Sequence, residues 1–132
     1  MSYTVGDVIA ERTVHLTRES LVRYAGASGD FNPIHYRDDV AAAVGLPGVL
    51  AHGMLTMGLA SSVVLAALPA DVKLVDYGVR FTKPVVVDPE AGADVHVVAK
   101  VGAVDESSAR IDLTVKHGDT TVLVKAQLRV AL

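Results

Sequence analysis

The feature that most constrains the fold is a long stretch without a formal charge, from Val40 to Ala70. A transmembrane helix is one interpretation, since about 20 apolar residues cross a bilayer. However, Pro47 interrupts the stretch early and Pro69 ends it, which leaves a helix from near His52 to Leu68. Apolar residues lie on every side of this helix, as in a helix that is buried all round. We therefore predict a core helix and no membrane span.

The C-terminal half alternates between apolar and polar residues. The apolar positions are Val75, Tyr77, Val79 and Phe81, then Ala109, Ile111, Leu113 and Val115, then Val122, Val124, Ala126, Leu128 and Val130. This alternation predicts three strands with one buried face. "HGDT" at 117–120 predicts a hairpin, "DESS" at 105–108 a second turn, and 94–104 a further strand. Near the N-terminus we expect a strand over 9–16, followed by a helix from the N-cap Thr17 to near Ala27.

These elements predict an α+β protein in which an antiparallel sheet wraps around one long buried helix, the layout of a hot-dog fold. Residues 1–132 fit a single domain, because 51% of them are hydrophobic and can supply one core. A sheet this short leaves exposed edge strands, which pairing with a second subunit would cover. We therefore expect a dimer.

The composition excludes several classes of protein. Charged residues make up 20% of the chain, and the formal net charge of −3 provides no basic surface for nucleic acid. The chain has no cysteine, which excludes disulfides and thiolate metal sites and fits a reducing compartment. The first residues include Asp7 and Glu11, where a secretion signal would be basic and then apolar. We expect a cytoplasmic protein without a nucleic-acid or membrane partner.

The segment "SGDFNPIH" places a carboxylate, Asp30, five residues before an imidazole, His35. Pro33 fixes its own φ and keeps Asn32 out of the helical region, and Gly29 permits an unusual backbone conformation. A rigid, non-helical loop is expected, and it could hold an acid and a base at one reacting atom. The alternative is a loop in which Asp30 and Asn32 only cap backbone N–H groups and His35 lies at the surface.

The segment "AHGMLTMGL" opens the predicted core helix, with Gly53 near its first turn. A helix N-terminus offers unpaired N–H groups and the positive end of a dipole. Because Gly53 has no side chain, a carbonyl oxygen could approach its N–H, as in an oxyanion hole. For Gly53 the alternative is tight packing against a strand. For His52 we favour a hydrogen bond that starts the helix.

"YAGASGDFNPIH" resembles the signature of the (R)-specific enoyl-CoA hydratases, or hydratase 2 type, in the MaoC-like group. "GLPGVLAHGMLTMGLASS" and "VRFTKPVVVDP" are similar to the helix start and the Arg-Phe-x-x-Pro-Val strand of that family. "AHGMLTMG" also resembles the catalytic subunits of (3R)-hydroxyacyl-ACP dehydratases, which can pair with a non-identical subunit. The resemblance covers most of the chain and implies a single MaoC-like hot-dog domain over 1–132. One departure is Ala27, where the family usually has Gly or a larger aliphatic residue.

The resemblance implies reversible hydration of a trans-2-enoyl thioester of CoA or acyl carrier protein to the (3R)-hydroxyacyl thioester. Asp30 would activate water, and His35 would handle the proton at C2. The N–H of Gly53 would receive the thioester carbonyl. The partner would be a second copy or a related hot-dog subunit.

The resemblance also assigns two supporting residues. Asn32 would stiffen the loop, and Ser61 matches a serine that hydrogen-bonds the catalytic aspartate. Either Ser61 or its neighbour Ser62 could instead bond back to its own helix. The implied chemistry needs no cofactor and no metal.

Several alternatives stay open at this point. A hot-dog thioesterase would not need His35, and a non-catalytic acyl-thioester-binding subunit should have lost Asp30 or His35. A metal site at Asp30, His35 and His52 is disfavoured because the spacing contains no helical i,i+4 pair. The remaining histidines are expected at the surface, at His15, His96 and His117. Basic residues could meet CoA phosphates or an acidic carrier protein, or be solvated strand residues, at Arg80, Lys83, Lys100 and Arg110.

Overall fold

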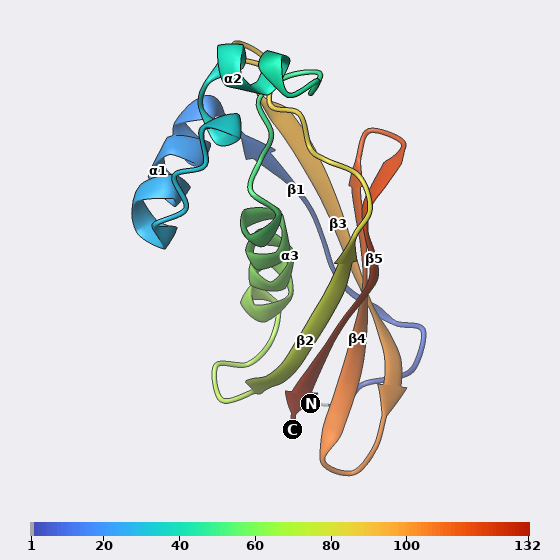
Figure 1. Ribbon diagram of the computed structural model, residues 1–132. Coiled ribbons are helices and arrows are strands. Elements are labelled where there is room, and N and C mark those ends of the chain that lie inside the picture. The colour runs from blue at the N-terminus through green and yellow to red at the C-terminus, as the bar shows by residue number, and fades with distance from the viewer. Residues whose placement is uncertain (1) are drawn as a thin grey trace.

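The computed structural model describes residues 2–132, and its fold confirms the predicted class (Figure 1). A curved antiparallel sheet wraps around one central helix, α3, which runs over Gly53–Ala66. The helical elements before it are α1 (Arg18–Ser28), a 3₁₀ turn (Pro33–His35) and α2 (Asp38–Ala43). The strands are β1 (Val8–Leu16), β2 (Lys73–Phe81), β3 (Ala93–Val104), β4 (Ser108–His117) and β5 (Thr120–Ala131).

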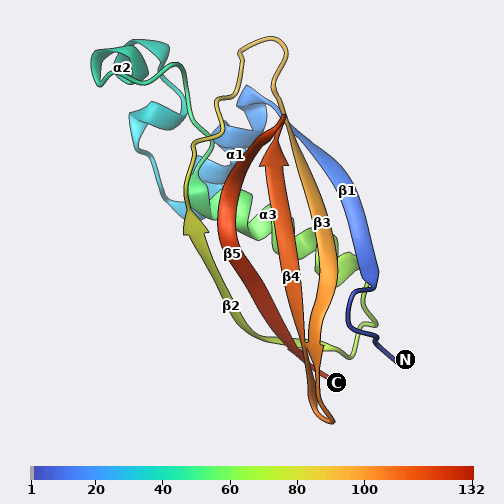
Figure 2. The same cartoon turned by 90° about the vertical axis from the view of Figure 1, so that its right-hand side faces the viewer.

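The sheet has five strands in the order β1-β3-β4-β5-β2, and every neighbouring pair is antiparallel. Figure 2 shows its curvature, with β1 and β2 at the two edges and α3 across the concave side. The predicted turns are confirmed, and Gly118 takes a φ of 60° in the two-residue turn between β4 and β5. Nearly all of β3, β4 and β5 alternates between buried and more exposed positions, as period-2 patterning predicts.

Helix α1 begins and ends with the predicted signals. The Thr17 hydroxyl accepts from the Ser20 N–H, and the Ser20 hydroxyl accepts from the Thr17 N–H, which makes a capping box. Gly29 ends the helix at a φ of 78°, in the left-handed region, and its N–H donates to the Ala25 carbonyl. The chain therefore leaves α1 in a defined direction, straight into the segment that carries Asp30.

Two local elements were not predicted. Residues 33–35 form a 3₁₀ turn, so the loop is not wholly non-helical as expected. Pro33 explains the turn, because its fixed φ suits the first position of a helix. Helix α2 has six residues, too few for a 3.6-residue period to be visible in the sequence.

The core helix α3 differs from the prediction in one respect. Its buried residues face the sheet, at Thr56, Leu59, Ala60, Val63 and Val64. The opposite face of α3, defined by Met54, Gly58, Ser62 and Leu65, is exposed in the single chain. The expected burial on every side is therefore wrong for this face, although it carries no charge. No helix among residues 2–132 is long and apolar enough to cross a membrane.

The edge strand β2 also exposes apolar side chains. Its predicted buried face holds only partly, since Tyr77 and Val79 are half-buried while Val75 is 57% exposed and Phe81 is 53% exposed. The outer backbone edge of β2 has no neighbouring strand within residues 2–132. Exposed apolar side chains beside an open edge favour coverage by another subunit.

Candidate active site

The loop from Ser28 to His35 is built from hydrogen bonds between its own side chains and backbone. The Ser28 hydroxyl accepts from the Asp30 N–H at 3.1 Å, and the Asp30 carboxylate accepts from the Asn32 N–H at 3.2 Å. The Asn32 side chain accepts from the Ile34 N–H at 3.3 Å. The alternative raised by the sequence is thus correct about capping by Asp30 and Asn32, but its surface histidine is wrong, because His35 is buried. The same bonds also fix the direction of Asp30, so capping and an active-site role are compatible.

His35 is held by the segment that precedes α3. Its Nδ1 lies 2.7 Å from the carbonyl oxygen of Leu50, and the Leu50 N–H donates to the Ile34 carbonyl at 3.1 Å. A carbonyl oxygen can only accept, so Nδ1 carries a proton and Nε2 keeps its lone pair in the neutral ring. Residues 49–51 are in turn hydrogen-bonded to residues 85–87. The Val87 N–H donates to the Val49 carbonyl, and the Ala51 N–H donates to the Val85 carbonyl. The connection between β2 and β3 therefore helps to set the ring position of His35, which is 8% exposed.

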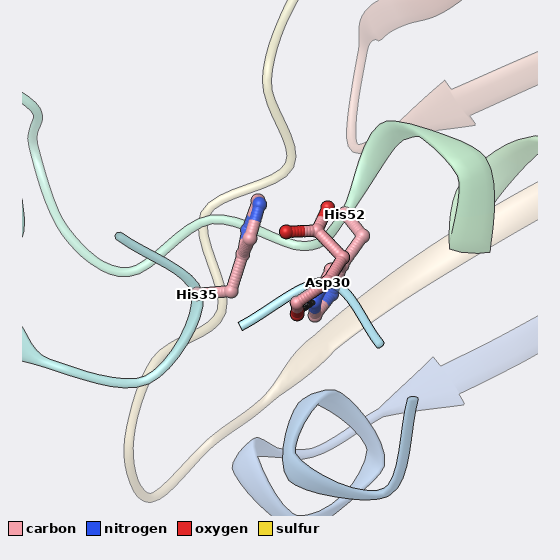
Figure 3. Close-up of side chains that lie close together, drawn as sticks. All are labelled: Asp30, His35 and His52. Carbon is pink, nitrogen blue, oxygen red and sulfur yellow. Dashed lines mark hydrogen bonds between the residues drawn. The ribbon is translucent and has the colours of Figure 1, made fainter. Parts of the chain in front are cut away.

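The structure brings Asp30 and His35 together, as the five-residue spacing predicts (Figure 3). One ligand atom from each of Asp30, His35 and His52 lies within 4.8 Å of the other two. Asp30 is exposed, whereas both imidazoles are buried. A carboxylate and an imidazole at this separation can exchange protons with one substrate or one water.

His52 is the residue whose place in the site was not predicted. Its side chain does not cap α3, so the expected helix-start hydrogen bond is wrong. Instead its Nε2 lies 3.2 Å from the backbone carbonyl of Asp30, and its ring stacks on that of His35 with centroids 3.8 Å apart. Tyr24 approaches the same ring edge-on at 4.8 Å. The sequence signals were its position directly before Gly53 and its grouping with Asp30 and His35 in the disfavoured metal site.

Burial lowers the pKa of His52, and proximity to His35 lowers it further. The hydrogen bond to the Asp30 carbonyl and the Asp30 charge act in the opposite direction. Burial is the largest of these effects, so the ring stays neutral around pH 7. In the neutral state the His52 Nε2–H donates to the backbone carbonyl of Asp30. The Nδ1 atom then carries a buried lone pair without a hydrogen-bond partner among residues 2–132.

The stacked rings are a poor pair of ligands for one metal ion. A metal binds a ring nitrogen along its lone pair, which lies in the ring plane. The His35 and His52 planes are only 20° from parallel and their centroids are 3.8 Å apart, so an ion at bonding distance from both rings cannot lie in both planes. Without a rearrangement, the trio suits proton transfer better than metal binding.

Gly53 is the first residue of α3, so its N–H has no partner within the helix. The ring of Phe81 packs over it, and a Cβ on residue 53 would lie 3.0 Å from that ring. A cavity of about 220 Å³ lies beside Gly53 and His35 and is also lined by Thr56 and Lys83. Gly53 is thus packed against Phe81 and also lines the same cavity as His35, and the binding of a carbonyl to its N–H stays a prediction.

The two supporting residues, Asn32 and Ser61, differ in how well their contacts fit the expected roles. Asn32 makes the loop contact that its expected stiffening role requires. The Ser61 hydroxyl donates to the Gly58 carbonyl at 2.9 Å, as does the Ser62 hydroxyl. The structure therefore shows both serines bonded back to their own helix, and the role of Ser61 toward Asp30 stays a prediction.

The fold is that of the hot-dog proteins, and it aligns with a solved structure described as a MaoC-like dehydratase at a TM-score of 0.89 and 33% identity. That alignment covers 98% of this chain and 40% of the other. Residues 3–124 match the family model described as MaoC like domain. The chain therefore belongs to the MaoC-like domain family, which confirms the resemblance seen in the sequence.

Two relatives are similar in sequence. The 3-hydroxyacyl-thioester dehydratase X of Mycobacterium tuberculosis is 39% identical over 79 residues, which is 60% of this chain and 27% of that protein. The (R)-specific enoyl-CoA hydratase of Rhodospirillum rubrum is 30% identical over 132 residues, 96% of this chain and 87% of that protein. This chain thus spans about a quarter of the first relative and most of the second.

Proposed function

We propose that this chain catalyses the reversible addition of water to trans-2-enoyl thioesters, which yields (3R)-hydroxyacyl thioesters. The observation that carries the proposal is the placement of the Asp30 carboxylate beside the His35 imidazole, next to the start of α3. The names of the two relatives, a hydratase and a dehydratase, describe the two directions of this one reaction.

In hydration, the Asp30 carboxylate takes a proton from water as the water oxygen attacks C3. The C2–C3 π electrons move toward the thioester carbonyl, whose oxygen gains negative charge. The Gly53 N–H, at the positive end of α3, donates to that oxygen. His35, protonated at Nε2, then gives its proton to C2. Dehydration runs in reverse, with neutral His35 taking the C2 proton and protonated Asp30 releasing the hydroxyl as water.

The substrate would enter beside Lys83, the basic residue that lines the cavity. Of the basic residues noted in the sequence, Arg110 is already paired with Asp112 at 2.9 Å. An ammonium at the cavity wall suits the phosphates that both CoA and the carrier-protein pantetheine arm carry. Lys83 therefore favours neither CoA nor the carrier protein over the other.

We also propose that the chain works as a dimer with a second hot-dog subunit, identical or related. The support is the open edge of β2 with Val75 and Phe81 exposed, together with the uncharged exposed face of α3. Because Phe81 packs over Gly53, coverage of this edge by a partner would also enclose the cavity.

The test is an assay of crotonyl-CoA that follows the enoyl absorbance and the free thiol in parallel. Loss of absorbance without thiol release, with (3R)-hydroxybutyryl-CoA as the product on chiral analysis, is the expected result. Thiol release instead would make the chain a thioesterase. Binding without any turnover would make it an acyl-thioester-binding subunit. Asp94→Asn, which alters an exposed carboxylate that contacts His15 on the sheet, serves as a matched control and should retain full turnover.

A further inference from the structure

We propose that His52 is a positioning residue, which holds Asp30 and His35 in their working arrangement without touching the substrate. The inference rests on the proposed function. It arises from the position of the His52 ring, which contacts both the backbone carbonyl of Asp30 and the face of the His35 ring (Figure 3).

The first contact fixes the acid. The His52 Nε2–H donates to the backbone carbonyl of Asp30, the residue whose side chain also accepts from the Asn32 N–H. Asp30 itself is exposed and lies in a loop, so local turn bonds alone would leave the loop free to shift against the rest of the site. The bond from His52 ties that loop to the start of α3, where Gly53 follows directly.

The second contact fixes the base. The Leu50 carbonyl holds one edge of the His35 ring, and the stacked His52 ring, 20° from parallel, covers one face. A hydrogen bond through one atom permits rotation about that bond, whereas a ring packed on the face opposes it. His35 is therefore restrained in both position and plane, with Nε2 left free.

The choice of imidazole at this position is not explained by packing alone. His52 is 1% exposed, and its Nδ1 has no hydrogen-bond partner among the residues from 2 to 132. A buried polar atom without a partner is destabilising, and a phenyl ring would fill similar space without it. The gain that imidazole offers is the Nε2–H bond to Asp30, together with the stacking surface for His35.

The charge state of His52 also matters to its neighbours. The titratable groups that face it are Asp30 from the loop, His35 from the 3₁₀ turn and Tyr24 from α1. His35 must carry a proton in one direction of the proposed reaction, and a second imidazolium stacked on it would repel that charge. Burial lowers the pKa of His52 and so keeps it neutral. A neutral neighbour leaves His35 free to gain and lose its proton.

Two variants separate the two contacts. His52→Gln keeps an N–H donor of similar reach but loses the stacked ring, and His52→Phe keeps the ring but loses the donor. We expect each to lower kcat for crotonyl-CoA hydration about 10- to 100-fold with KM changed less than about 3-fold, since small displacements of positioned groups have effects of this size. The control is Val64→Ala, at a fully buried position on α3 away from Asp30, His35 and His52. It shows how a loss of stability alone affects kcat.

The second readout is the ¹⁵N spectrum of the His35 ring, which reports which ring nitrogen carries the proton. The line widths of the same resonances report how rigidly the ring is held. We expect the Nδ1–H form with narrow lines in the parent and in Val64→Ala, and broadened His35 ring resonances in His52→Gln, because an unstacked ring can rotate about its bond to Leu50. Unchanged kcat in both His52 variants, or His35 resonances as narrow in His52→Gln as in the parent, would overturn the inference. A parent protein with no hydratase activity would refute the proposed function instead, and the ¹⁵N spectra would then decide the role of His52 alone.

Discussion

At the scale of single residues, the proposed reaction requires the Asp30–His35 pair to hold one proton between them. Hydration begins with the proton on His35 and an ionised Asp30, and dehydration begins with the proton on Asp30. The Leu50 carbonyl keeps the Nδ1 proton of His35 out of this exchange, so only Nε2 takes part. Each member of the pair is useful only while the other is present.

Asp30→Asn should therefore nearly abolish turnover and leave the fold intact. The amide oxygen can still accept from the Asn32 N–H, so the loop keeps its shape, but the amide cannot take a proton from water. We expect turnover of crotonyl-CoA to fall at least about 100-fold, the usual scale for a positioned acid or base. Circular dichroism should be unchanged, and near-normal turnover in the folded variant would remove Asp30 from the mechanism.

The factors by which Asp30→Ala and His35→Ala each slow the hydration of crotonyl-CoA should not multiply in the double variant. If one proton passes between the two groups, removal of either already disables the step, and the double variant should be only slightly slower than each single variant. Steady-state hydration rates of the three variants beside the parent provide the measurement. Two losses that combine multiplicatively would mean that the residues act independently.

Tyr77 should make the protein sensitive to alkali. Its hydroxyl donates to the Met57 carbonyl in α3 at 2.7 Å, and burial raises its pKa to about 12. In the folded protein the pKa of Tyr77 lies above its ordinary value of 10.0. The contribution of the Tyr77 hydroxyl to the free energy of unfolding is therefore complete below about pH 10 and is lost as the pH approaches about 12. Tyr77→Phe should be less stable than the parent by about 1 kcal/mol at neutral pH.

Urea unfolding of the parent and of Tyr77→Phe at about pH 8 and about pH 11 tests this prediction. A stability difference between the two proteins that narrows at high pH reports ionisation of Tyr77. A difference that stays constant would mean that the tyrosine does not ionise in this range.

At the scale of elements, most of the fold could be predicted and the exceptions have physical causes. Alternation and turn residues located all the strands, and Thr17 located the start of α1. Helix α2 was missed because one and a half turns carry no visible period. The exposed face of α3 was missed because an uncharged helix surface looks the same in a sequence whether the chain itself or a second subunit covers it.

The candidate site, like the fold, could be predicted only in part. Asp30, His35 and Gly53 could be selected because their residue types and local spacing carry chemistry. The Leu50 carbonyl could not, because a backbone atom leaves no mark in the sequence. His52 was grouped with His35 only as part of a disfavoured metal site. Its stacking on His35 was missed, since stacking depends on how the loop at 30–35 folds back onto the start of α3.

Arg18 should be the main link between the helical elements. Its Nε donates to the Val87 carbonyl at 2.6 Å and its two terminal nitrogens donate to Asp38, with the side chain 20% exposed. We expect Arg18→Ala to lower the free energy of unfolding by about 1–3 kcal/mol, because a partly buried, charge-assisted set of bonds is lost.

Arg23→Ala is the matched control for this prediction. Arg23 pairs with Glu19 on the surface of the same helix, and its side chain is 79% exposed. Such i,i+4 pairs contribute about 0.3–0.5 kcal/mol. Equal urea midpoints for the two variants would show that Arg18 does not tie α1 to α2 and to the segment that precedes β3.

At the scale of the whole molecule, the open β2 edge predicts an oligomer. We expect light scattering to give the mass of a dimer over a wide range of dilution. Val75→Asp, which places a charge on the exposed apolar surface of β2, should shift the equilibrium toward monomer. Thr114→Asp, at an exposed position on the central strand β4, should leave the mass unchanged. A parent protein that is monomeric at every concentration would contradict the prediction.

The compactness of the site along the chain has an evolutionary consequence. Asp30, His35, His52 and Gly53 all lie within one short segment, whereas the strands that support them extend to the C-terminal end. A few substitutions in that segment would silence the chemistry and leave the sheet, its edge and its pairing surface intact. After gene duplication, one copy could therefore lose the proposed catalytic residues and persist as the scaffold of the other.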